Sequence, residues 1–329
     1  MNTEEKMNFF LTGKETVGIA GHVRPDGDCV GSTLAIYNYI KEYYPQIDVR
    51  LYLEPIPNVF KFLRYADEIR SDYTDEIVFD LFIVCDCGDE GRLGNAVKYY
   101  ENARNTLCID HHVSNQEFAQ HNYIFPDASS TCELVYGLLD RAHITKEIAE
   151  CLYTGMVHDT GVFQYSCTSA KTMNIAGQLM ELGIDYSEIV DATFYTKTYA
   201  QNQILGQALL DSRLYLDGRC IISVVTKEEM DEFGVLPKHL DGIVNQLRVT
   251  KGVVVAAFMY QNEDGSFKVS LRANGTFDVA ALAMHFGGGG HVKAAGYTAF
   301  EDAETAKDIL MEEIEKRLYY YGKWHCKCV

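Results

Sequence analysis

The chain has 329 residues, of which 47% are hydrophobic and 23% charged, which is typical of a globular protein long enough for two domains. Its formal net charge of −18 opposes non-specific binding to long duplex nucleic acid, because such binding neutralises many phosphates. No apolar run approaches the roughly 20 residues of a membrane span, and the acidic N-terminus is unlike a secretory signal, so a cytoplasmic protein without a membrane partner is expected.

The first part of the chain alternates short apolar runs with amphipathic segments. Leu34, Tyr37 and Ile40 lie at helical spacing, which predicts the crossover helix that parallel strands require. Further helices are predicted from about residue 146. Residues 1–195 are therefore expected to form an open parallel sheet with helices on both faces. The predicted buried strands, too short for helices and rich in branched residues, are 17–22, 50–54, 81–86 and 106–110.

The pattern changes after residue 195, which predicts a linker over 196–212 and a smaller α+β domain over 213–329. Paired β-like runs flank Asp217-Gly218 and again Asp264-Gly265, and Asp-Gly between such runs is a strong hairpin signal. The last predicted helix begins with acidic residues, as the helix dipole favours. Helices are expected in this domain at 241–249, 278–287 and 301–321.

The ten cysteines are scattered without the paired spacing of a zinc site, so we interpret them as small hydrophobic residues of the core in a reducing compartment. The C-terminal segment HCKCV offers His325, Cys326 and Cys328, which is three ligands where structural zinc usually takes four. A frayed terminus explains this segment better, and no function is assigned to it.

Acidic and imidazole side chains follow the predicted strands of the first domain. In an open α/β sheet, ligands bind beyond the carboxyl ends of the strands, so residues far apart in sequence converge there. We expect these side chains to form a metal site. They are His22, Asp26 and Asp28 after the first strand, Asp86 after the third, Asp110, His111 and His112 after the fourth, and Asp159 in a helical segment.

Each of these residues also has a simpler explanation. Asp26 and Asp28 lie in a Pro-Asp-Gly turn, Asp86 is placed to cap a helix, and a His-His pair is common on surfaces. These explanations do not account for acids and imidazoles at one strand end after another, with Arg24 almost the only base. Clustered carboxylates repel one another unless cations lie between them, which favours the metal site.

Carboxylate and imidazole ligands suit Mn²⁺ or Mg²⁺ better than ions that prefer thiolate. The number of acids is enough for two divalent ions, most simply Mn²⁺, with Mg²⁺ or Co²⁺ as alternatives. Two ions about 3.5 to 4 Å apart generate hydroxide from water and stabilise the oxygens of an in-line phosphoryl displacement. Phosphoester hydrolysis is therefore the predicted reaction.

Four segments, in this order, resemble the four motifs of the DHH phosphoesterases: HVRPDGD, VCDCGD, IDHHVSN and MVHDTGVF. The family takes its name from the triplet that is Asp110-His111-His112 here. The resemblance implies a metal set in which His22 and Asp26 bind one ion, Asp28, His111 and Asp159 bind the other, and Asp86 bridges both. It also implies that His112 contacts the scissile phosphate and that Asp110 orients a ligand without touching an ion, so that His112, Asp110 and Asp86 are the catalytic candidates.

In the second domain, FGGGGHVKAAG, residues 286–296, resembles the signature of the DHH-associated C-terminal domain, and VSLRANG precedes it. A glycine run lets backbone N–H groups approach a phosphate or base, although a flexible loop is the simpler explanation of glycines alone. Ala273 and Val292 depart from the family, where a serine and a basic residue are common, and this leaves substrate preference open. The substrate-binding candidates are Gly288, Gly289, Gly290, His291 and Arg272, with Arg248 and Lys293 as weaker ones.

The resemblance covers nearly the whole chain and is nearest to the compact nanoRNase and pAp phosphatase subfamily, whose substrates bind in a cleft between the domains. It implies a Mn²⁺-dependent hydrolase that shortens very short single-stranded RNA, cleaves linear dinucleotides, or removes the 3′-phosphate of adenosine 3′,5′-bisphosphate (pAp). A homodimer is left open. The alternatives are an inorganic pyrophosphatase, which would match in the first domain only, and a nucleotide-binding regulator without turnover.

Overall fold

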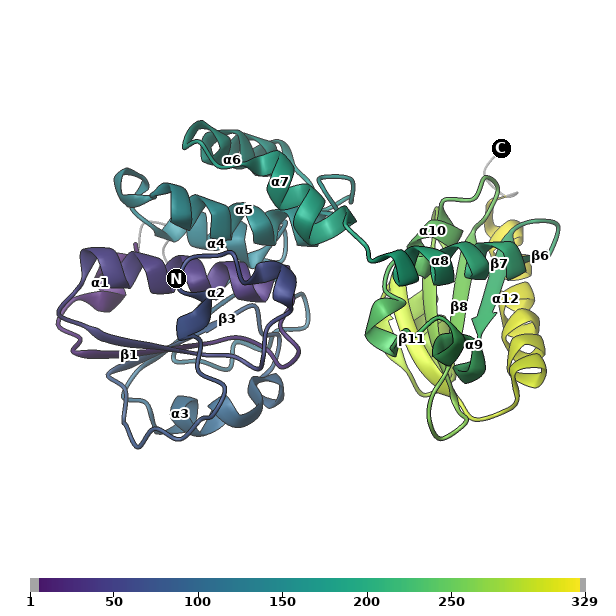
Figure 1. Cartoon of the computed structure of the whole chain (residues 1–329), viewed down its shortest axis with the longest axis horizontal. Helices are drawn as coiled ribbons and strands as arrows, with labels where there is room; N and C mark the ends of the chain where they lie inside the picture. Colours follow the sequence, from purple (N-terminus) through teal and green to yellow (C-terminus); the bar gives the residue numbers. More distant parts are fainter. Residues whose placement is uncertain (1–5, 326–329) are drawn as a thin grey trace. The chain divides into compact units, whose positions relative to one another are not determined.

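The computed structural model describes residues 6–325, with side chains up to residue 319. The chain divides into two compact units, Met1–Thr196 and Lys197–Val329. Each unit contains one sheet covered by helices (Figure 1). None of the helices in the described part of the chain is both long and apolar enough to cross a bilayer.

The first unit is built on five parallel strands in the order β2-β1-β3-β4-β5. The four predicted strands are confirmed within two residues at each end. The fifth was not predicted, because its HNYI sequence is only half-buried and lacks an apolar run. The order reverses between β1 and β3, and such a switch point opens a crevice for ligands. The strands are β1 Thr16–Ala20, β2 Asp48–Tyr52, β3 Leu81–Cys85, β4 Thr106–Asp110 and β5 His121–Ile124.

Helices cover both faces of this sheet, as predicted. Ile83 of β3 packs in a core with residues of α2, α4 and α5, whereas its neighbours Phe82 and Val84 pack in a second core with Tyr99 of α3. Figure 1 shows α3 across the sheet from α2. The α-helices are α1 Met7–Leu11, α2 Gly27–Tyr43, α3 Val97–Asn102, α4 Thr131–Leu138, α5 Lys146–Thr160, α6 Ala170–Glu181 and α7 Tyr186–Val190. Short 3₁₀ helices are η1 Asn58–Phe60, η2 Ala66–Glu68, η3 Glu90–Ala96 and η4 Arg141–His143, and a π-helix, η5 Asp191–Tyr195, ends the unit.

The second unit has a mixed sheet of six strands in the order β10-β11-β9-β8-β7-β6. Both predicted hairpins are confirmed: β6 and β7 pair antiparallel, as do β8 and β9. Gly218 and Gly265 have φ of 80° and 86°, which glycine adopts without strain. The strands are β6 Arg213–Tyr215, β7 Cys220–Val225, β8 Val255–Gln261, β9 Phe267–Ala273, β10 Gly289–His291 and β11 Ala294–Ala299. The helices are α8 Tyr199–Asp211, α9 Lys227–Glu232, η6 Pro237–His239, α10 Ile243–Arg248, α11 Val279–His285 and α12 Ala303–His325.

The expected linker over 196–212 is mostly helix. Residues Tyr199–Asp211 form α8, which begins with a capping box between Thr198 and Gln201. Ile204 and Ala208 are buried in a core of the second unit. Two buried apolar residues four positions apart are a weak signal in a polar stretch, which is why the sequence did not predict this helix.

The prediction that the cysteines fill the core is wrong for one of them. Of the eight cysteines in the described residues, Cys167 is exposed and the other seven are buried. Its Sγ lies 3.7 Å from the carbonyl oxygen of Asp159. The Cys326 and Cys328 positions of the tail lie outside the described residues, and the side chain of His325 is not described.

Candidate metal centre

The turn after β1 directs three side chains to two different places. Asp26 is the N-cap of α2, where its Oδ1 accepts the N–H groups of Asp28 and Cys29, both at 3.2 Å. The turn expected at Asp26 is therefore the start of a helix, and the cap uses only one of the two carboxylate oxygens. The cap expected at Asp86 is wrong: Asp86 directly follows β3, and the N-cap position of the next helix, η3, is Asp89. His22 and Asp26 lie in a group of potential ligands with Asp86, while Asp28 lies in another group with His111 and Asp159. One turn thus contributes to two ligand groups.

Asp86 lies between these two groups. Its Oδ2 is 3.5 Å from His22 Nε2, and its Oδ1 is 3.6 Å from His111 Nε2. The side chain is buried, and Thr131 Oγ1 donates a hydrogen bond to Oδ1 at 3.2 Å. Asp86 also has φ of 53°, a conformation that costs a non-glycine residue energy and is found most often at functional sites. A carboxylate with its two oxygens facing separate imidazoles is suited to bridge two ions.

Asp28 is held in place by the N-terminus of α4. Its Oδ2 accepts the N–H of Thr131 at 2.6 Å, and its Oδ1 accepts the N–H of Cys132 at 2.9 Å. A helix N-terminus favours an anion through these unpaired N–H groups and the dipole. Burial and the charges of Asp159 and Asp86 nevertheless raise the pKa of Asp28 well above its usual value. A cation between these carboxylates would remove that repulsion.

Both ligand histidines present the same nitrogen to the carboxylates. His22 Nδ1 lies 2.8 Å from the carbonyl oxygen of Val23, and His111 Nδ1 lies 3.4 Å from that of Ala128. Because a carbonyl oxygen only accepts, each Nδ1 carries a hydrogen, and Nε2 is the atom that can bind an ion. His111 Nε2 also lies 3.0 Å from Asp159 Oδ2.

The electrostatics of the cluster call for positive charge. Burial favours the neutral ring, but hydrogen bonds and charges of Asp26 and Asp86 raise the pKa of His22 to about 10. Burial lowers the pKa of His111 as well, but the hydrogen bond with Asp159 and the charges of Asp28, Asp159 and Asp86 outweigh this effect and raise it to about 10. Divalent ions at the Nε2 atoms would supply the positive charge that protonated rings otherwise supply. Oxygen and imidazole donors in this arrangement fit two hard or borderline divalent ions.

The remaining members of the triplet form a pair of their own. His112 Nδ1 donates to Asp110 Oδ1 at 2.7 Å, and Asn115 Nδ2 donates to Asp110 Oδ2 at 2.7 Å. The bond with Asp110 raises the pKa of His112. His112 Nδ1 is 3.7 Å from Asp86 Oδ1. Asp110 therefore orients His112, which leaves Nε2 of that ring as the atom that can contact a phosphate.

The sequence reasoning missed the residues that support Asp28. Thr131 and Cys132 act through backbone N–H groups, which no residue type reveals. One signal was present: Ser130 and Glu133 have the spacing of a helix start, and Ser130 Oγ does accept the N–H of Glu133, at 3.1 Å. A helix start that packs against a buried acid is a recognisable anion-binding element.

In the second unit, the substrate-binding candidates lie close together on the sheet. Ala294 of β11 pairs with Arg272 of β9 on one side and with His291 of β10 on the other. The flexible-loop explanation is wrong for Gly289 and Gly290, which pair with β11. A Cβ at Gly288 would lie 2.2 Å from the carbonyl oxygen of Gly296, so only glycine fits there.

The cationic candidates of this unit have polar partners within it. Arg272 Nε donates to Asn245 Oδ1 at 3.0 Å, and Arg248 donates to Asn274 Oδ1 at 3.0 Å. Lys293 Nζ donates to the carbonyl oxygen of Gly275. The weaker candidates Arg248 and Lys293 thus have structural roles on the loop around Asn274.

Comparison with known proteins supports both halves of this description. The family profile described as "DHH family, N-terminal domain" matches residues 16–156, and the profile described as "DHHA1 domain" matches residues 217–318. The chain is 28% identical to the bifunctional oligoribonuclease and PAP phosphatase NrnA of Thermus thermophilus, over 92% of this chain and 90% of that protein. It is 27% identical to the protein of the same name from Bacillus subtilis, over 92% and 94%. The crystal structure of an exopolyphosphatase-related protein from Bacteroides fragilis superimposes with a TM-score of 0.87 at 28% identity, over 94% of each chain.

Proposed function

This chain belongs to the DHH family and carries the DHHA1 domain, and from that premise we propose that it is a two-metal phosphohydrolase of very short nucleic acids. Its substrates would be short single-stranded RNA and linear dinucleotides, cleaved to mononucleotides, and pAp, dephosphorylated to AMP. The observation that carries this proposal is Asp86, whose two oxygens face His22 and His111 at 3.5 and 3.6 Å. Two ions bound there would activate water and neutralise the phosphate oxygens.

The geometry supports two ligand sets. His22 and Asp26 would hold one ion, Asp28, His111 and Asp159 the other, and Asp86 would contact both. Asp26 is the exposed member of the first set, since 59% of its side chain is accessible to solvent. We propose that solvent and substrate reach the site past this residue. Mn²⁺ is the ion we propose, because this carboxylate-rich site without thiolate ligands suits it.

His112 is proposed to stabilise the charge that develops on the phosphate. Asp110 holds Nδ1 of His112 and raises the pKa of that ring, so Nε2 can donate a charge-assisted hydrogen bond to a phosphate oxygen. The orientation is set before substrate arrives, since Asn115 fixes the other oxygen of Asp110. Preorganised donors of this kind are worth far more than mobile ones.

The second unit is proposed to hold the nucleotide. The neighbouring positions of Arg272 and His291 across β11 combine two donors for phosphate or base, and the edge strand β10 presents its backbone beside them. The names of the two relatives combine RNA cleavage with PAP dephosphorylation, which supports both reactions in one protein. A cytoplasmic location is part of the same proposal.

The first experiment incubates the purified protein and Mn²⁺ with four substrates in parallel: a 5′-labelled RNA dinucleotide, a longer oligomer, pAp and pyrophosphate. Loss of the dinucleotide or pAp, with pyrophosphate intact, is the expected result. Cleavage of pyrophosphate alone would replace the proposal with the pyrophosphatase. Absence of product from all four, together with thermal stabilisation by nucleotide without Mn²⁺, would identify a binding regulator instead.

A further inference from the structure

His158 packs directly against the turn that carries two metal ligands. It lies on α5 beside Asp159, and its ring covers Gly27, the residue between Asp26 and Asp28. A Cβ at position 27 would lie 2.3 Å from Cγ of His158, so the backbone of the turn touches the ring face. Any shift of the His158 ring therefore acts on the backbone that connects these two ligands.

The opposite end of the ring is bonded to the last element of the first unit. His158 Nε2 lies 3.0 Å from Thr193 Oγ1 in the π-helix η5. Thr193 Oγ1 donates its own hydrogen to the carbonyl oxygen of Ile189 at 2.7 Å, so it accepts from Nε2–H of His158. The ring also contacts Phe60 and Phe194 edge to face, with centroid distances of 5.0 and 5.7 Å.

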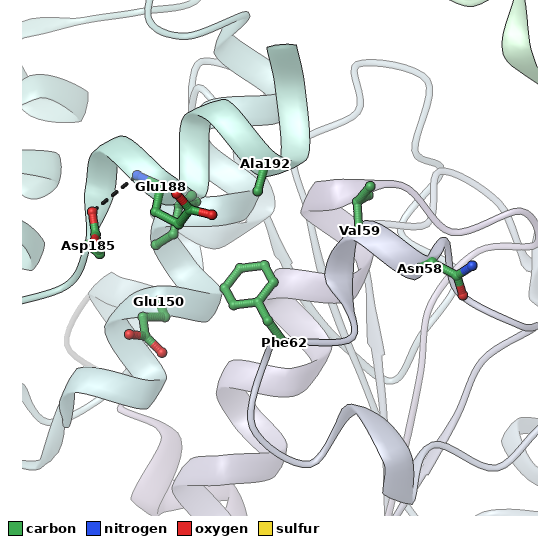
Figure 2. Close-up of a pocket in the computed structure, with 8 residues that line it drawn as sticks. Asn58, Val59, Phe62, Glu150, Asp185, Glu188 and Ala192 are labelled. Atoms are coloured by element: carbon green, nitrogen blue, oxygen red, sulfur yellow. Dashed lines mark hydrogen bonds between the residues drawn. The ribbon is translucent and has the colours of Figure 1, made fainter. Parts of the chain in front are cut away.

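The surroundings of η5 are not tightly packed. A surface pocket of about 360 Å³ lies beside η5, and Figure 2 shows two of its lining residues, Val59, which precedes Phe60, and Ala192, which precedes Thr193. The ring of Phe62 projects into it from one side. π-Helices are rare and occur most often at functional sites. Because Val59 and Phe62 in this pocket are 41% and 47% exposed, η5 borders solvent on this side and has room to change position.

We propose that His158 is a positioning residue that couples the metal-ligand turn to η5, which leads into the boundary between the two units at Thr196 and Lys197. Ion binding at the turn then stiffens η5 through the Gly27, His158 and Thr193 contacts, and displacement of η5 weakens ion binding. This rests on the metal site of the proposed function, but not on the identity of its substrate.

The test is hydrogen exchange of the full chain with and without saturating Mn²⁺, measured for residues 191–196. The amide of Thr196 reports on η5, since it donates to the carbonyl oxygen of Asp191 at 2.7 Å. In the wild type, Mn²⁺ should slow exchange of this segment about fivefold or more, the effect of stabilising one hydrogen bond. Calorimetry under the same conditions confirms that Mn²⁺ is bound.

Three single variants and one double variant test the coupling contact. His158→Phe keeps an aromatic ring over Gly27 and removes the hydrogen bond to Thr193. Thr193→Val removes the acceptor of that bond together with the bond that Thr193 Oγ1 donates to the carbonyl oxygen of Ile189. Both variants should lose the Mn²⁺-dependent protection of residues 191–196 from hydrogen exchange while retaining bound Mn²⁺. The double variant should lose no more of this protection than either single variant. In His158→Gln the amide nitrogen reaches nearly as far as Nε2 of histidine. This variant should therefore keep part of the Mn²⁺-dependent protection.

Unchanged exchange in the wild type with Mn²⁺ bound would overturn the proposal, as would full protection in both His158→Phe and Thr193→Val. A metal-dependent response in a protein that cleaves none of the four substrates would support the coupling and reject the proposed function. Failure to bind Mn²⁺ at all would reject both.

Discussion

Asp110 Oδ1 lies 2.7 Å from His112 Nδ1, and this bond leaves Nε2 as the nitrogen of His112 that could contact a substrate. Replacing Asp110 with Asn keeps a carbonyl acceptor but removes the charge that raises the pKa of the ring. We expect Asp110→Asn to lower kcat about 10- to 100-fold, the usual effect of losing an orienting partner, with bound metal unchanged. Steady-state kinetics and metal analysis of the same samples measure both.

Asn115→Ala serves as a matched control, because Asn115 supports Asp110 from the other oxygen at 2.7 Å. Asn115→Ala should also lower kcat, but by a smaller factor than Asp110→Asn. If Asp110→Asn lost its metal and regained full activity at high Mn²⁺, Asp110 would be acting on the ions rather than on His112.

Asp86→Ala should abolish turnover and reduce the number of bound ions, since the two oxygens of Asp86 face the imidazoles of the two ligand groups. The chain should stay folded, because the neighbours of Asp86 are themselves polar and one repulsive charge is removed. Metal analysis, kinetics and thermal melting of one preparation check the three statements.

His291→Ala provides the comparison for Asp86→Ala in the other unit. We expect it to raise KM for the dinucleotide about tenfold or more, as expected for a lost charge-assisted hydrogen bond, with metal content near that of the wild type. Equal loss of metal in both variants would contradict the division of roles between the two units.

The glycine run contains a matched pair of positions. Gly288→Ala places a Cβ 2.2 Å from the carbonyl oxygen of Gly296, whereas Gly289→Ala meets no atom within 4 Å. We expect Gly288→Ala to destabilise the second unit by about 1 to 3 kcal/mol and to raise KM, while Gly289→Ala stays near the wild type in stability. Urea denaturation and substrate titration compare the two, and indistinguishable variants would mean that the β10-β11 pairing is not needed for binding.

The ionisation of Glu133 is expected to make the stability of the first unit depend on pH. Its side chain is buried, yet hydrogen bonds from Thr172 and Ser129, both at 2.7 Å, and from Lys171 hold its pKa below the usual value despite burial. A carboxyl whose pKa is lowered by folding stabilises above its unfolded pKa of about 4.3 and loses that contribution as pH falls through the folded value.

Glu133→Gln should therefore be less stable than the wild type by about 1 to 3 kcal/mol at pH 7, and the difference should shrink below about pH 4. Urea denaturation of both proteins over this pH range, without added metal, measures it. If the difference in the free energy of unfolding stays constant with pH, the lower stability of Glu133→Gln comes from the geometry of the amide rather than from the missing charge.

Much of this protein was predictable from its sequence because the signals are local. Buried parallel strands are continuous apolar runs, and Asp-Gly between β-like runs specifies a hairpin, so both sheets could be foreseen in outline. The convergence of the candidate metal ligands was predictable for a related reason: side chains that follow parallel strands meet at one edge of the sheet. The repetition of acids and imidazoles there carries the chemistry, and it does not depend on details of packing.

Only the tertiary structure decided how those residues are held. The N–H groups of Thr131 and Cys132 bind Asp28 from more than 100 positions away in the chain, and His158 joins Gly27 to Thr193. Backbone donors have no residue signature, and contacts at such separations depend on how helices pack on the sheet. For the same reason β5 and α8, which lack a strong periodic pattern, appear only once their neighbours bury them.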